Sequence, residues 1–127
     1  MIVISIVKYL LFIGLLALIS CSDEGVISNP NQIVFPTSGV SYSQHVAPLM
    51  AVSCSMSGCH DMPRTTNNNK YFTSWVGVRG VAEPFDTTCP LIRVTSGIQP
   101  HWSGVLNLNA NHREGLKTWV LEGVLYN

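Results

Sequence analysis

Two cysteines and a histidine lie close together near the middle of the chain, as Cys54, Cys59 and His60. Thiols and imidazoles bind metal ions, and outside the cytoplasm two such thiols also form disulfides. The second cysteine directly precedes the histidine, and consecutive side chains generally diverge. The pair is therefore better suited to two separate atoms of one large group than to a single ion. This motif constrains the fold most, because the rest of the domain must be built around whatever it holds.

The first twenty residues are almost entirely apolar and carry one charge, at Lys8. Their unbroken apolar run, residues 9–19, is too short for a membrane span of roughly 20 residues but fits a secretory signal. Residues 18–21 read LISC and resemble the bacterial lipobox, whose cysteine becomes the lipidated N-terminus. We therefore predict a lipoprotein signal peptide at 1–20, with Cys21 anchored in membrane lipid of the bacterial cell envelope, on the periplasmic face or the outer-membrane surface. An uncleaved membrane anchor and an ordinary secreted protein are the alternatives.

The rest of the chain divides into an expected tether and one small domain. Residues 21–40 contain Pro30, Pro36 and several polar residues without a helical period, which predicts a lipid-anchored tether. A short strand at 32–35 that packs on the domain is the alternative. Residues 41–127 are expected to form a single small domain, mainly α with long loops. So small a domain has difficulty burying enough apolar area, and a large apolar cofactor would help it.

Helical spacing of apolar residues appears near both ends of this domain. The first run surrounds Pro48, so a helix should begin or bend there. The last run should form the closing helix, capped by Asn109 or Asn111, with Glu114 completing a capping box after Asn111. Residues 71–81 are moderately helical, and residues 89–94 form a short apolar turn. The two runs are Val46, Leu49, Met50 and Ser53, and then Leu116, Trp119, Val120, Gly123 and Val124.

The charges exclude some classes of function. Seven basic and seven acidic residues balance, so we expect no nucleic-acid partner. The carboxylates are isolated and no glycine-rich phosphate loop is present, so the sequence indicates no enzyme. Near-zero net charge argues against strong electrostatic steering toward a partner protein.

The context of the cysteine motif resembles a family of small bacterial cytochrome c domains. In that family a helix of the pattern V-x-P-hydrophobic-hydrophobic, here Val46 to Met50, leads to a cysteine and then to the haem histidine. The closing segment 116–127, LKTWVLEGVLYN, is similar to the family's last helix. The resemblance covers roughly residues 41 to 127 and is thin in the middle. The usual haem motif is C-x-x-C-H, and four residues separate the cysteines here.

This resemblance implies a cytochrome c-like fold and one covalently attached haem c. Cys54 and Cys59 would form the thioether bonds, and His60 would be the proximal iron ligand. The function it implies is electron transfer to a transient redox partner protein. Such encounters use small interfaces.

The sixth iron ligand is where the chain departs from the family, which uses a methionine shortly before the last helix. Methionines 50, 56 and 62 surround the haem motif, and no methionine follows. His101 stands in the expected place and is the candidate distal ligand. His112 is the second candidate, with a solvated position at the helix start as its other interpretation.

Three other interpretations stay open. Cys54, Cys59, His60 and Cys89 could form a structural zinc site, or Cys54 and Cys59 a disulfide in an interaction module. An open iron position would permit peroxidase-like haem chemistry. If haem takes the motif, Cys89 is expected to be a small buried apolar side chain.

Overall fold

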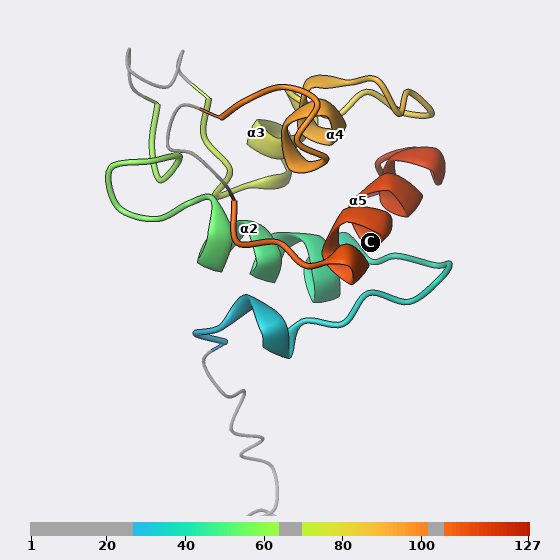
Figure 1. The fold of residues 1–127 in the computed structure, drawn as a ribbon, viewed down its shortest axis with the longest axis horizontal. Coiled ribbons are helices and arrows are strands. Elements are labelled where there is room, and N and C mark those ends of the chain that lie inside the picture. The colour runs from blue at the N-terminus through green and yellow to red at the C-terminus, as the bar shows by residue number, and fades with distance from the viewer. Residues whose placement is uncertain (1–26, 64–69, 102–105) are drawn as a thin grey trace, which may run out of the picture.

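The computed structural model describes residues 27–63, 70–101 and 106–127. Over these ranges the chain is small and mainly helical, with four α-helices joined by loops and no strand (Figure 1). The predicted mainly α class is therefore confirmed. No helix in the described ranges is long and apolar enough to span a membrane. The predicted signal peptide and Cys21 lie outside the described residues.

The first long helical stretch contains two kinds of helical turn. A π-helical turn, η2, spans Tyr42–Val46, and α2 follows directly as Ala47–Ser53. Pro48 lies in the first turn of α2, where its missing N–H leaves no hydrogen bond unmade. Leu49 and Met50 are buried on the inner face of this helix. The sequence therefore located this helix and its start correctly.

The closing helix α5 spans Ala110–Leu121. Asn109 caps it by accepting a hydrogen bond from the His112 N–H at 2.9 Å, and the His112 side chain accepts from the Asn109 N–H at 3.2 Å. The capping box predicted from Asn111 and Glu114 is therefore wrong, although Asn109 was correctly offered as a cap. The Asn111 amide is instead engaged by the Phe35 backbone, accepting from its N–H at 2.8 Å and donating to its carbonyl at 3.0 Å.

The closing helix ends earlier than its apolar period predicts. Gly123 has φ of +98° and Val124 has φ of +57°, so both residues lie past the helix end. Their N–H groups donate to Val120 O and Trp119 O, both at 3.1 Å, which is the Schellman arrangement of a helix C-terminus. Val124 is still buried, because the left-handed turn directs its side chain back into the core. The period identified a buried residue and not the end of the helix.

Part of the predicted tether belongs to the domain. Ile33, Phe35 and Val40 are buried in the core after a short 3₁₀ turn, η1, at Pro30–Gln32. The backbone N–H of Val40 donates to the Glu122 carboxylate at 2.8 Å, which ties this segment to the end of α5. The tether prediction is therefore wrong for residues 33–40. Its alternative was right about the packing, but no strand forms there.

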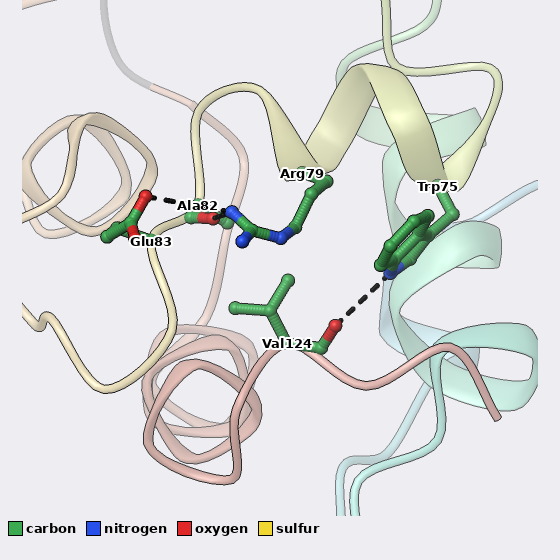
Figure 2. Close-up of polar contacts among 5 residues, drawn as sticks. All are labelled: Trp75, Arg79, Ala82, Glu83 and Val124. Atoms are coloured by element: carbon green, nitrogen blue, oxygen red, sulfur yellow. Dashed lines mark hydrogen bonds and ion pairs between the residues drawn. The ribbon is translucent and has the colours of Figure 1, made fainter.

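Two short helices cover the opposite side of α2 from this N-terminal segment (Figure 1). They are α3 at Trp75–Arg79 and α4 at Pro90–Thr95. The turn predicted at 89–94 is thus a helix, with Pro90 in its first turn. Figure 2 shows how α3 is held: Trp75 Nε1 donates to Val124 O at 3.2 Å, and Arg79 donates to Ala82 O at 3.1 Å. The Arg79 guanidinium also lies 3.6 Å from the Glu83 carboxylate.

Candidate functional site

The cysteine–histidine motif forms a closed loop at the end of α2. The N–H groups of Cys54 and Ser55 both donate to Met50 O, at 2.9 and 2.7 Å, which ends the helix. The His60 N–H then donates to Cys54 O at 3.2 Å and closes the loop. Gly58 has φ of +84°, a left-handed conformation that costs glycine little, and it turns the chain toward Cys59. In Figure 1 this loop lies at the opposite end of the molecule from the last turn of α5.

The environment of Cys54 favours an uncharged sulfur. Burial, and after it the nearby Cys59, raise the pKa of the Cys54 thiol to about 12. A thiolate is therefore strongly disfavoured, because desolvation penalises the charged form. No disulfide joins the two cysteines. A thioether carries no charge, so this position suits a covalently alkylated sulfur better than a bare thiolate ligand.

Two orphaned hydroxyls flank Cys54. In the described part of the chain, Ser53 Oγ and Ser55 Oγ are buried without a hydrogen-bond partner. A buried hydroxyl that makes no hydrogen bond costs about 1–3 kcal/mol. A further group lying against Cys54 would be in a position to satisfy them.

His60 is held in one orientation by its neighbours. Its Nδ1 lies 3.0 Å from Lys70 O. A carbonyl oxygen only accepts hydrogen bonds, so Nδ1 must carry the proton and Nε2 the lone pair. The Phe72 ring stacks on the imidazole, with 4.2 Å between ring centroids and 26° between planes. A neutral imidazole whose other nitrogen donates to a carbonyl is the usual form of a metal-binding histidine.

His101 lies beside His60, although the two are far apart in the sequence. Their ring centroids are 6.1 Å apart and the ring planes are inclined by 57°. Burial, and after it the His60 imidazole, lower the pKa of His101. Both effects favour the neutral ring, which is the form that ligates metals. The structure thus brings together the two histidines that the sequence singled out as iron ligands.

His112 is in a different position. It is completely buried, its Nδ1 accepts from the Asn109 N–H, and its Nε2 lies 3.1 Å from Ile33 O. Both ring nitrogens are therefore engaged by the backbone. The interpretation of His112 as a solvated residue is wrong, and as a ligand it would have to abandon both hydrogen bonds.

The methionines and the remaining cysteine differ in their burial. Met50 is part of the buried core, whereas the side chains of Met56 and Met62 are exposed. Cys89 is 2% exposed and belongs to the same core, as the sequence predicted. Within residues 27–63, 70–101 and 106–127, no three His, Cys, Asp or Glu residues gather to hold a metal ion. All four members of the zinc alternative lie in these ranges, so their placement does not favour that site.

Sequence reasoning missed the residues that orient His60. The Lys70 carbonyl is a backbone group, so no side-chain pattern signals it. Phe72 was interpreted only as an apolar residue of a helical stretch, yet it precedes α3 and covers the imidazole. No sequence pattern predicts that either residue contacts His60, because the loop that brings them back to it has no periodic pattern.

Comparisons of the chain with protein-family models, with curated proteins and with solved structures find no match.

Proposed function

We propose that this protein is an electron carrier with one covalently attached haem c, and that its fold is a small variant of the cytochrome c type. Cys54 and Cys59 would hold the haem through thioether bonds. His60 and His101 would ligate its iron. When bound, the haem supplies an iron that alternates between the ferric and ferrous states and so carries one electron.

One observation carries this proposal: the 6.1 Å between the ring centroids of His60 and His101. A metal–imidazole bond is about 2 Å long, and a ring centroid lies about 1 Å beyond its donor nitrogen, so rings on opposite sides of one ion have centroids roughly 6 Å apart. His60 also presents Nε2 as its lone-pair nitrogen, because Nδ1 faces Lys70 O. The pair therefore has a separation and a protonation state suited to ligating one iron.

The residues around the motif support covalent attachment. The Cys54 site disfavours a thiolate, and the unpartnered hydroxyls of Ser53 and Ser55 favour a further group beside it. Phe72 stacks on one face of His60. The chain's own contribution is to bind the group, fix the ligand plane and limit solvent access. Histidine in place of methionine lowers the reduction potential, because the thioether favours ferrous iron.

The setting that we propose follows from the N-terminal segment. Cys21 anchors the protein in membrane lipid of the bacterial envelope, and several acyl chains at about 0.8 kcal/mol per buried CH₂ hold it there stably. Its partner is a redox protein met in brief encounters, which use small interfaces. With balanced charges the association depends little on salt.

A visible spectrum and an extraction test the proposal. Full-length protein, produced with a haem-attachment system and purified in detergent, should show a sharp Soret band that stays with the polypeptide through acid-acetone extraction. A matched sample produced without that system supplies the haem-free control. Colourless protein from both, with zinc found by elemental analysis, would replace this proposal with the zinc alternative. Colourless, metal-free protein would favour the interaction module.

A further inference from the structure

We infer that Phe72 is a positioning residue: its ring holds the imidazole plane of His60 in the orientation needed for iron ligation. The inference rests on the proposed function, but the contacts that carry it are independent of any cofactor. They lie between His60 and the segment 70–72, which the sequence did not connect to the motif.

Three contacts join His60 to this segment, and each restrains a different part of the residue. The Phe72 N–H donates to His60 O at 2.9 Å, which fixes the backbone. The Lys70 carbonyl lies 3.0 Å from Nδ1, which selects the ring edge that carries the proton. The Phe72 ring stacks on the imidazole at 4.2 Å, which fixes the ring plane. A histidine side chain has two rotatable bonds, so the last two contacts together determine its orientation.

The stacking contact is the one that a side-chain substitution removes selectively. The other two contacts with this segment use backbone atoms of Lys70 and Phe72, so the atoms that make them remain in place when the Phe72 side chain is changed. An aromatic pair contributes about 0.5–1.5 kcal/mol beyond its buried area. Its loss therefore predicts a roughly two- to thirteenfold fall in the equilibrium ratio of the observed ring orientation to its alternatives.

The matched variants are Phe72→Leu, Phe72→Tyr and Trp75→Leu. The leucine keeps an apolar side chain at position 72 but cannot stack, whereas tyrosine can. Trp75 is a second partly buried aromatic on the same stretch of chain that packs against the same core. Its ring contact is with Tyr126, at 5.7 Å, so it controls for a general loss of packing.

Two measurements read the orientation without reference to activity. Nitrogen NMR of histidine-labelled full-length protein in detergent reports whether Nδ1 of His60 is protonated. The chemical shifts of the His60 ring protons report whether the Phe72 ring is stacked on the imidazole. This spectrum is recorded on haem-free protein. Electron paramagnetic resonance of the ferric haem protein reports the ligand plane through the spread of its low-spin signal.

We expect Phe72→Leu to lower the ratio of Nδ1-protonated to Nε2-protonated His60 by about two- to thirteenfold and to broaden the low-spin signal. Phe72→Tyr and Trp75→Leu should keep the parent spectra. An unchanged Phe72→Leu spectrum would overturn the inference, as would a Trp75→Leu change of equal size. If the parent protein carries no haem, the proposed function fails, and the haem-free NMR comparison still decides whether Phe72 orients His60.

Discussion

His112 and the His60–His101 pair occupy opposite kinds of environment within one small domain. His112 is completely buried, and both of its ring nitrogens are engaged by the backbone of Asn109 and Ile33. His60 and His101 are only partly buried, and their ring centroids are 6.1 Å apart. His60 engages Nδ1 with the Lys70 carbonyl. The comparison shows that the backbone engages both ring nitrogens of His112, whereas at His60 it engages Nδ1.

The two histidine environments also differ in the secondary structure around them. His112 is in the first turn of the longest described helix, α5, where its side chain completes a capping box. His60 and His101 lie in loops, where few regular hydrogen bonds constrain the backbone. Under the proposed function, stability should be concentrated on the α5 side and ligand binding on the motif side. The following predictions test that division.

The largest expected effect is on covalent attachment. Replacing Cys54 and Cys59 together by alanine should abolish covalently bound haem, because both thioether bonds are lost. Haem-stained denaturing gels and the intact mass of the polypeptide measure this. Cys89→Ala should leave the stain unchanged, since Cys89 is a core residue. A normal stain in the double variant would contradict the assignment of the motif.

A second prediction concerns the Cys54 thiol in haem-free protein. With a pKa of about 12, against an ordinary value near 8.5, its thiolate fraction at neutral pH should be roughly three-thousandfold lower than that of a free cysteine. Alkylation of Cys54 by iodoacetamide should be slower by a similar factor and should accelerate tenfold per pH unit up to about pH 12. Peptide mass spectrometry over time follows it. A rate that levels off near pH 9 would mean that Cys54 is not desolvated.

Part of the candidate site can be predicted from the sequence. The motif, the proximal histidine and the choice of His101 over a methionine all come from residue types and their order. The meeting of His60 with His101 does not, because a contact between two loops leaves no periodic trace. The burial of His112 was missed for a related reason. Its carbonyl partner belongs to Ile33, in a segment that polar composition assigned to a tether.

The fold shows the same limit. Apolar spacing located α5 and the continuous helical stretch η2–α2, because a long helical stretch repeats the apolar signal. It failed at α4, where six residues, Pro90–Thr95, carry less than two turns of pattern. It also failed at residues 33–40, where three isolated apolar side chains in extended backbone are held by contacts with Asn111 and Glu122 far along the chain.

The third prediction separates the two histidine environments directly. His101→Ala should convert six-coordinate iron to a form that binds carbon monoxide, whereas His112→Ala should retain six-coordinate spectra. Difference spectra of the reduced proteins with and without carbon monoxide measure this. A six-coordinate His101→Ala protein would point to another ligand. Ready binding by the parent protein would indicate an open position and favour peroxidase-like chemistry.

The fourth prediction reverses the order for stability. His112→Ala removes a helix cap partner, leaves Ile33 O unpaired and opens a cavity, so it should lower the free energy of unfolding by about 2–4 kcal/mol. The partly exposed His101 should cost much less when replaced in haem-free protein. Urea denaturation of the haem-free variants, followed by circular dichroism, gives both values. If both variants lost the same free energy of unfolding, the proposed division between a structural α5 side and a ligand-binding motif side would be wrong.

The smallest expected effect concerns the contact that secures His112. Gly115 faces Phe35 so closely that a Cβ at this position would overlap the Phe35 ring, and Phe35 in turn contacts His112 edge-on at 6.2 Å. Overpacking of this kind costs about 1–3 kcal/mol, and alanine recovers up to about 1 kcal/mol through its higher helix propensity. Gly115→Ala should therefore lower the free energy of unfolding by roughly 1–2 kcal/mol. The haem spectrum should stay unchanged, because the displaced ring lies on the α5 side of the molecule.

Gly58→Ala is the matched change on the motif side: a Cβ there meets open space, and the cost comes from its φ of +84° alone. It should cost a similar 1–2 kcal/mol, but because Gly58 precedes Cys59 it should also reduce the yield of attached haem. If Gly115→Ala altered the haem spectrum and Gly58→Ala did not, the two sides would be coupled through α5, and the division of roles between them would have to be abandoned.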